Sequence, residues 1–258
     1  MEYAVITGAS SGIGACFARR FAREGFSLVL VARREERLWQ LKEELLKENP
    51  KLDILVLALD LTDLGACDTL MDRVMELPVR FFINNAGFGD CGIFTEGDIK
   101  KELGMIDLNI KTLHYLTKKA LICYENREDV YILNVGSSAG LLPAGPYMAT
   151  YYASKAYVVS LTRAIAEELK EQKKGCYIGV LCPGPVDTEF NRVANVRFAL
   201  KGITPEACVD YAYRQMLRRK VTIVPTAGLR IAITWGRLLP VRTLTRMCAH
   251  QQKKKIYA

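Results

Sequence analysis

Short apolar runs alternate with longer amphipathic segments along the first 225 residues of the chain. The runs carry little of the polar–apolar alternation of a half-exposed strand, which is typical of strands buried on both faces of a parallel sheet. The expected strands are Tyr3–Thr7, Phe26–Ala32, Asp53–Leu59, Arg80–Ile83, Val130–Val135, Tyr177–Cys182 and Val221–Val224. The expected helices are Cys16–Glu24, Glu35–Glu48, Leu64–Met75, Asp98–Tyr124 with a break near Asp107 or Asn109, a helix that carries Tyr151 and ends near Lys173, and Pro205–Arg219.

Strands and helices that follow one another through short connections imply a parallel sheet with right-handed crossovers. We therefore expect an α/β fold, a Rossmann-like doubly wound parallel sheet of about seven strands with helices on both faces. The length suits one such domain. Residues 1–225 are expected to form it, with residues 226–258 as an extension. The stretch from Glu189 to Gly202 shows no strong period.

The net charge of +8 is concentrated near the C-terminus. From Arg218 onward there is no Asp or Glu, and the remainder of the chain carries 8 − 10 = −2. The ten basic residues are Arg218, Arg219, Lys220, Arg230, Arg237, Arg242, Arg246, Lys253, Lys254 and Lys255. The basicity therefore belongs to the C-terminal part of the chain, from Arg218 onward, and not to the residues before it.

The eight cysteines are scattered, with no Cys-x-x-Cys pair, and only two histidines occur. No metal site is predicted, and buried thiols in a reducing compartment are favoured over a disulfide framework. A strand-like run begins within two residues of Met1, which leaves no room for a signal peptide. No apolar run reaches the roughly 20 residues of a spanning helix. We expect a cytoplasmic protein.

A glycine-rich turn, Gly8-Ala9-Ser10-Ser11-Gly12-Ile13-Gly14, lies between the first expected strand and the first helix. The start of a helix presents free N–H groups, and glycines let a pyrophosphate approach the backbone. The spacing Gly-x-x-x-Gly-x-Gly differs from the Gly-x-Gly-x-x-Gly dinucleotide pattern. Its position after the first strand nevertheless favours a nucleotide site.

Two arginines, Arg33 and Arg34, end the second expected strand, where dinucleotide folds meet the adenosine ribose. An acidic residue there suits a free 2′-hydroxyl, and a guanidinium suits a 2′-phosphate. Arg33, with Arg34 as helper, therefore predicts NADP(H), with NAD(H) less favoured. The alternative is a solvated pair at the start of a helix.

Tyr151 and Lys155 are four residues apart, so on a helix they share one face. A phenol titrates near pH 10, and a cation one turn away would lower that pKa. Such a phenol can exchange a proton with a reacting oxygen. The spacing alone is also that of a half-buried aromatic beside a solvated lysine.

These motifs together resemble the short-chain dehydrogenase/reductase family, in its compact single-domain form. The resemblance covers residues 3 to about 224 and is specific because order and separations all fit. The matching stretches are Thr7-Gly8-x-x-x-Gly12-Ile13-Gly14, Asp60, Asn84-Asn85-Ala86-Gly87, Asn109, Ser138, Tyr151-x-x-x-Lys155 and Pro183-Gly184.

The resemblance implies four catalytic residues. Tyr151 would be the general acid/base, and Ser138, thirteen residues before it, would polarise the carbonyl oxygen. Lys155 would hold the nicotinamide ribose and lower the Tyr151 pKa, and Asn109 would support a proton path. Ser137 would then face away from the site, and Tyr152 would pack in the core or at a subunit contact.

The expected cofactor contacts surround the same crevice. They are Gly8, Ser10, Ser11, Gly12, Ile13, Gly14, Arg33, Arg34, Asp60, Leu61, Asn85, Ala86, Gly87, Tyr151, Lys155, Pro183, Gly184, Val186 and Thr188. The resemblance also implies a homodimer or homotetramer.

The extension interleaves apolar residues with its arginines, and Pro240 is expected to separate two short helices. It could cover the substrate cleft or a subunit contact, or lie on a membrane surface. Nucleic-acid binding is not favoured, because no aromatic-rich basic platform occurs. With the apolar stretch Phe190–Ile203, the tail suggests a bulky apolar substrate, steroid-like or long-chain acyl.

The sequence therefore predicts an NADP(H)-dependent oxidoreductase that interconverts a ketone and a secondary alcohol. The alternative is a protein that senses NADP(H) at a membrane or partner, with incidental catalysis.

Overall fold

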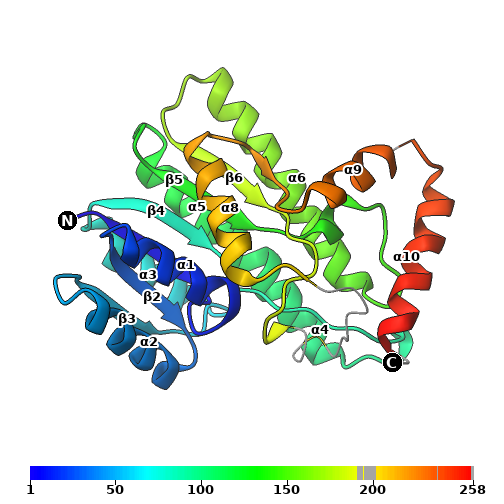
Figure 1. The fold of residues 1–258 in the computed structure, drawn as a ribbon, viewed down its shortest axis with the longest axis horizontal. Helices are drawn as coiled ribbons and strands as arrows, with labels where there is room; N and C mark the ends of the chain where they lie inside the picture. Colours follow the sequence, from blue (N-terminus) through cyan, green and yellow to red (C-terminus); the bar gives the residue numbers. More distant parts are fainter. Residues whose placement is uncertain (191–193, 195–201, 237, 257–258) are drawn as a thin grey trace.

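In a computed structural model of the chain, seven parallel strands form one sheet with helices packed on both of its faces (Figure 1). The structure describes residues 1–190, 194, 202–236 and 238–256. The order in the sheet is β3-β2-β1-β4-β5-β6-β7. The strands are β1 Tyr3–Thr7, β2 Ser27–Ala32, β3 Ile54–Ala58, β4 Val79–Asn84, β5 Tyr131–Val135, β6 Tyr177–Leu181 and β7 Thr222–Ile223. The predicted fold class is confirmed.

Most of the helices lie where the periodicity placed them. They are α1 Gly12–Arg23, α2 Glu35–Glu48, α3 Leu64–Met75, α4 Ile99–Ile106, α5 Leu113–Tyr124, α6 Ala149–Glu171, α8 Pro205–Leu217, α9 Ala227–Gly236 and α10 Val241–Ile256, with short 3-10 turns η1 Phe94–Glu96 and η3 Ser138–Leu141 and a π-helical segment η2 Asp107–Thr112. α1 begins four residues before its predicted start, because its first turn contains two glycines that add nothing to an apolar pattern. Most of the stretch Glu189–Gly202 lies outside the described residues.

The central strands are buried on both faces, which explains their lack of alternation. Ala4 and Ile6 of β1 pack in one core cluster with residues of α1, α2 and α8. Val5, between them, packs in a second cluster with residues of α3, α5 and α6. Successive side chains of a strand point to opposite faces, so each strand serves both clusters.

The direction of strand addition reverses between β1 and β4, and ligands bind outside the strand ends at such a point. The two strand ends are tied together there. The Thr7 hydroxyl accepts hydrogen bonds from the backbone N–H groups of Asn85 and Ala86 at 2.9 and 3.0 Å, and the Asn85 amide donates to Thr7 O at 2.9 Å. The glycine-rich turn and the Asn84–Gly87 turn therefore flank one crevice.

The C-terminal extension folds back onto the domain. α9 and α10 follow one another around Pro240, as predicted, and α10 flanks the end of the molecule where α6 begins (Figure 1). Ile233 and Cys248 are buried, and the Gln252 side chain donates a hydrogen bond to the Tyr152 hydroxyl at 2.5 Å. None of the described helices is both long and apolar enough to cross a membrane.

Candidate active site

Tyr151 lies in the first turn of α6 and Lys155 in the second, one helical turn apart. Both are buried, with 8% and 4% of their surfaces exposed. The Lys155 ammonium lies 5.9 Å from the centre of the Tyr151 ring and donates a hydrogen bond to the carbonyl of Val135, at the end of β5, at 3.0 Å. The helix therefore presents the pair to the carboxyl end of the sheet.

The hydroxyl that meets Tyr151 comes from Ser137. Ser137 is buried, caps η3 by accepting from Ala139 N at 3.1 Å, and is near enough to the Tyr151 phenol to lower its pKa. Ser138 begins η3, and its backbone N–H donates to the carbonyl of Pro183 at 2.8 Å. The prediction that Ser137 faces away is wrong, and the assignment of Ser138 as the polarising hydroxyl rested on a residue count. A count cannot anticipate the loop path, in which Tyr147 adopts a φ of 67°.

Burial dominates the acid–base properties of the pair. Desolvation raises the pKa of Tyr151 to about 12, against the opposing effect of the hydrogen bond with Ser137. Desolvation also lowers the pKa of Lys155 to about 8. The expected lowering of the Tyr151 pKa by Lys155 is therefore not found in the chain by itself. Tyr151 is a neutral phenol at pH 7.

Asn109 lies within the π-helical segment η2, close to the predicted break. The segment joins α4 to α5, and such widened turns are common at functional sites. The buried Asn109 amide donates to Phe88 O at 2.8 Å and to the Ser154 hydroxyl at 3.1 Å, and accepts from Phe88 N at 3.1 Å. Asn109 thus holds the loop after β4 against the helix that carries Tyr151.

The glycine-rich turn has no room for side chains. Gly8 and Gly12 have positive φ values of 67° and 53°, and a Cβ on Gly14 would lie 2.3 Å from the carbonyl oxygen of Gly8. The N-cap residue Ser11 makes no side-chain hydrogen bond to the first turn of α1. The N-terminus of this helix can therefore receive an anion, as a dinucleotide pyrophosphate requires.

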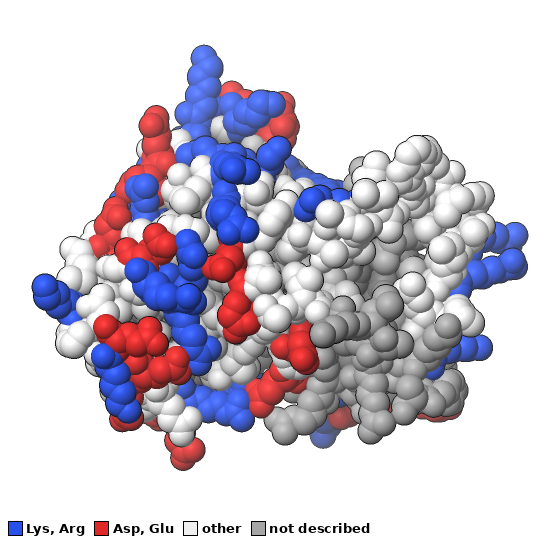
Figure 2. Space-filling view, in the orientation of Figure 1, with Lys and Arg blue, Asp and Glu red and all other residues white. Residues whose placement is uncertain are grey.

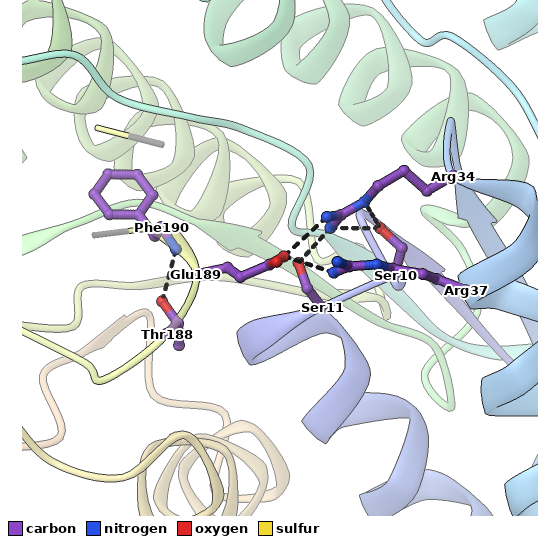
Figure 3. A network of polar contacts seen from close by, with 7 residues as sticks. All are labelled: Ser10, Ser11, Arg34, Arg37, Thr188, Glu189 and Phe190. Carbon is purple, nitrogen blue, oxygen red and sulfur yellow. Dashed lines mark hydrogen bonds and ion pairs between the residues drawn. The ribbon is translucent and has the colours of Figure 1, made fainter. Parts of the chain in front are cut away.

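Arg34 reaches over this turn (Figure 3). Its guanidinium donates to the Ser11 hydroxyl at 2.8 Å and to the Ser10 hydroxyl at 3.1 Å, and it pairs with Glu189 at 2.9 Å. Arg33, the predicted main contact, is 67% exposed in its side chain and lies 3.9 Å from Asp60. The Arg34 guanidinium already binds a carboxylate and two serine hydroxyls, so the residues present fit an anionic group of a nucleotide.

The remaining predicted cofactor residues lie in the turns that follow the strands or next to them. Asp60 accepts two hydrogen bonds from Thr62, and the Leu61 carbonyl accepts from the Thr112 hydroxyl. A Cβ on Gly87 would lie 3.4 Å from the Lys155 ammonium, and one on Gly12 would lie 3.2 Å from Thr188. Ile13, Asn85, Ala86, Pro183, Gly184 and Val186 belong to the same turns.

A pocket opens beside Tyr151, between the loop after β4 and the start of α6, and its wall combines apolar side chains with the polar Asp90, Glu102 and Thr150. Phe190 packs on the Tyr151 ring with the ring centres 5.5 Å apart. The residues that line the pocket include Ile93, Phe94, Met105, Tyr147, Met148 and Tyr151. Residues 191–193 and 195–201 of the predicted substrate stretch lie outside the described residues.

Two residues of this region were not predicted from the sequence. Arg37 pairs with Glu189 at 2.8 Å; it is three residues after Arg34, a separation that shares a helix face. Gln252 contacts Tyr152 from a segment 100 residues away, which no local pattern signals.

No cluster of three or more metal-ligating side chains occurs in the described parts of the chain.

Comparison with known proteins agrees with this geometry. The family model described as short chain dehydrogenase matches residues 2–197. Sulfoacetaldehyde reductase 2 of Chromohalobacter salexigens is 37% identical over 196 residues, covering 74% of this chain and 75% of the relative. Mouse 17-beta-hydroxysteroid dehydrogenase type 3 is 31% identical over 199 residues, covering 75% of this chain and 63% of the relative.

Solved structures show the same fold, in complexes with NADPH and with NAD. A short-chain dehydrogenase from Sphingobium yanoikuyae in complex with NADPH has a TM-score of 0.83 and 32% identity, with 92% of each chain covered. The sheet order, the glycine-rich turn and the paired tyrosine and lysine are thus accompanied by similarity over most of the chain. The protein belongs to the short-chain dehydrogenase/reductase family and is an oxidoreductase.

Proposed function

We propose that this enzyme is an NADP(H)-dependent oxidoreductase that interconverts a ketone and a secondary alcohol on an apolar substrate, with Tyr151 as the general acid/base. One observation carries the proposal. Tyr151 and Lys155 are buried one helical turn apart on α6, and Ser137, just after β5, lies close enough to the Tyr151 phenol to lower its pKa.

The bound nicotinamide would supply or accept the hydride. Charge then develops on the carbonyl oxygen, and two preorganised donors can stabilise it. Because burial raises the pKa of Tyr151 to about 12, its phenol remains protonated at pH 7 and can donate that proton to the oxygen. Ser137, whose proximity lowers the pKa of Tyr151, supplies the second hydroxyl. We assign it the role first given to Ser138.

Lys155 can restore the proton to Tyr151. Its pKa of about 8 lies near the operating pH, where a group both gives and regains protons readily. Asn109 fixes the loop after β4 against α6, as its bonds to Phe88 and Ser154 show. We therefore propose positioning as its part in the proton path.

We propose NADP(H) as the cofactor on the basis of Arg34, Arg37 and the two serine hydroxyls. A guanidinium is planar and pairs well with phosphate, and the hydroxyls of Ser10 and Ser11 complete the cradle. The NADPH complex of the similar Sphingobium enzyme supports the choice. Arg33 lies on the Asp60 side of the same site.

An apolar substrate is supported by Ile93, Phe94, Met105 and Met148 in the lining of the pocket beside Tyr151, although Asp90, Glu102 and Thr150 add polar groups to that lining. A steroid-like or long-chain acyl compound would fill such a surface. The similarity to a hydroxysteroid dehydrogenase supports this substrate class. Membership of the family does not by itself identify the substrate, because a similar protein is a sulfoacetaldehyde reductase.

The test is a panel of ketosteroids and 3-oxoacyl thioesters with NADPH, followed by loss of absorbance of the reduced cofactor. We expect turnover that the Tyr151→Phe variant loses while it still binds NADPH. Full turnover in the variant would refute the assignment. NADPH binding without turnover of any ketone would favour the alternative, an NADP(H)-sensing binding protein.

We also propose that the surface of α9 and α10 contacts a membrane. Trp235 and Leu238 are 67% and 75% exposed, and Ile231 and Met247 are also exposed. In Figure 2 the surface over these helices is almost entirely uncharged, with basic side chains at its outer edge. Flotation with anionic liposomes should be lost on removal of residues 226–258, and unchanged flotation would end this proposal.

We propose that the protein forms a homodimer or homotetramer and that the surface of α4 to α6 is the subunit contact. Ile99, Leu103 and Ile122 are 63%, 52% and 66% exposed there. Light scattering after size-exclusion chromatography would measure the mass, and a monomer at micromolar concentration would contradict the proposal.

Six of the cysteines, Cys16, Cys67, Cys123, Cys176, Cys182 and Cys208, are free thiols. This supports the proposed cytoplasmic location, because thiols persist in reducing compartments.

A further inference from the structure

The carboxylate of Glu189 lies between two guanidinium groups at the cofactor crevice (Figure 3). Its Oε2 atom is 2.9 Å from Arg34 and 2.8 Å from Arg37. These contacts join the loop after β6 to the start of α2, segments about 150 residues apart in the sequence.

The partners of this carboxylate are the groups that the proposed function assigns to the 2′-phosphate. Arg34 also donates to the hydroxyls of Ser10 and Ser11 at the glycine-rich turn. The pKa of Glu189 is lowered to about 2 by its hydrogen bonds with the two arginines, so it is ionised at every physiological pH. An anion from the chain itself therefore occupies the centre of the cradle.

The next residue in the chain contacts the catalytic tyrosine. Phe190 packs on the ring of Tyr151 at 5.5 Å, and its backbone N–H donates to the Thr188 hydroxyl at 3.3 Å. Thr188 in turn lies against Gly12 of the glycine-rich turn. A displacement of Glu189 would therefore also displace Phe190, the next residue, and change its contact with the Tyr151 ring.

We propose that Glu189 is a specificity-determining residue whose carboxylate competes with the 2′-phosphate of NADP(H) for Arg34 and Arg37. Displacement of the carboxylate shifts the segment 188–190 and moves Phe190 relative to Tyr151. NAD(H) has no 2′-phosphate, so it leaves both ion pairs in place. The inference rests on the proposed function, in which NADP(H) is the cofactor.

The ion pairs of Glu189 with Arg34 and Arg37 form in the free protein, but they are weak enough for a bound phosphate to replace the carboxylate. The side chains of Arg34, Arg37 and Glu189 are 43%, 42% and 27% exposed, and ion pairs of this exposure contribute little to stability. A phosphate monoester carries more charge than a carboxylate and offers three oxygens to the two guanidinium groups. The phosphate should therefore win the exchange at equilibrium.

Calorimetric titration with 2′-phospho-ADP and with ADP tests the competition in three proteins: the wild type, Glu189→Gln and the control Glu36→Gln. The control removes one acidic charge from the exposed first turn of α2. We expect Glu189→Gln to bind 2′-phospho-ADP about three- to tenfold more tightly than the wild type. The affinity for ADP should change less than about twofold, and the control should match the wild type for both nucleotides.

Hydrogen exchange of residues 183–190 tests the link to the tyrosine. In the wild type, saturating 2′-phospho-ADP should speed exchange in this segment relative to saturating ADP. In Glu189→Gln the exchange should already be fast with either nucleotide. Equal exchange in the two wild-type complexes would overturn the coupling.

The two proposals can fail separately. A wild type that binds 2′-phospho-ADP no more tightly than ADP would overturn the cofactor assignment and this inference with it. A clear wild-type preference that Glu189→Gln leaves unchanged, or that Glu36→Gln alters equally, would overturn the role of Glu189 alone.

Discussion

Two adjacent tyrosines on α6 face two different regions of the molecule. Tyr151 lies beside Lys155 and Ser137 at the strand ends, and Tyr152 meets Gln252 and Cys248 of the C-terminal helix. Both are buried, and burial raises the pKa of each. The difference between the two proposed roles therefore rests on the partners of each tyrosine and not on burial.

The comparison shows how a perturbed pKa should be used. Desolvation alone does not distinguish a catalytic phenol from a structural one, although strongly shifted groups are often candidates for function. Tyr151 has a second hydroxyl and a lysine within reach of the cofactor crevice, and Tyr152 has an amide from a helix that closes the domain.

The largest expected difference between the two regions is in kcat, when the hydroxyl of Tyr151 or that of Tyr152 is removed. Tyr151→Phe is expected to lower kcat by about 10²- to 10⁴-fold, the range for loss of a general acid/base. Tyr152→Phe should retain kcat within about threefold, because its hydroxyl has no part in proton transfer. Steady-state NADPH oxidation measures both, and a larger loss in Tyr152→Phe would reverse the assignment.

Substitution of Ser137 or Ser138 tests which of the two hydroxyls takes part in catalysis. Ser137→Ala is expected to lower kcat by about 10²-fold, as loss of one preorganised donor does. Ser138→Ala is the matched control and should change kcat by less than about threefold. The opposite ranking would restore the original assignment of Ser138.

Substitution of Lys155 tests how much the burial of its charge lowers the free energy of unfolding. Its pKa falls from 10.5 to about 8 in the folded chain, a penalty of about 3 kcal/mol at pH 7. Lys155→Met should therefore unfold at higher urea concentration and be more stable by about 1 to 2 kcal/mol, part of the gain being lost because Val135 O loses its donor. The same variant should lose activity.

The gain in Lys155→Met should depend on pH. Below pH 8 the lysine is charged in both states, so the penalty is fully present. Between pH 8 and 10.5 the folded chain binds fewer protons than the unfolded chain, so the penalty decreases as pH rises. The stability difference from wild type should be largest at pH 7 and smaller at pH 9.5. An equal difference at both pH values would contradict burial as the cause.

The contact between Tyr152 and Gln252 should give the smallest effect. Tyr152→Phe leaves a buried amide without its partner and is expected to cost about 1 to 2 kcal/mol of unfolding free energy. The double variant Tyr152→Phe with Gln252→Leu removes both polar groups and should recover most of that loss. Urea denaturation measures the cycle, and additive losses would show that the two side chains are not coupled.

Much of the fold could be predicted because its signals are local. The bounds of α2 and α3 agree with the amphipathic pattern, and the break in the long helix falls at the π-helical segment that contains Asn109. The pairing of Tyr151 with Lys155 needed only the period of a helix. Ser137 was missed because its direction depends on how η3 and the loop through Tyr147 turn after β5.

The sequence by itself determined the order of strands and helices, the glycine-rich turn and the spacing of the acid–base pair, since each depends on neighbouring residues along the chain. Only the tertiary structure decided that Glu189 meets Arg34 and Arg37, that Gln252 meets Tyr152, and that burial outweighs Ser137 in setting the pKa of Tyr151. Those outcomes depend on distances between segments far apart in the sequence and on exclusion of water, and neither has a local pattern.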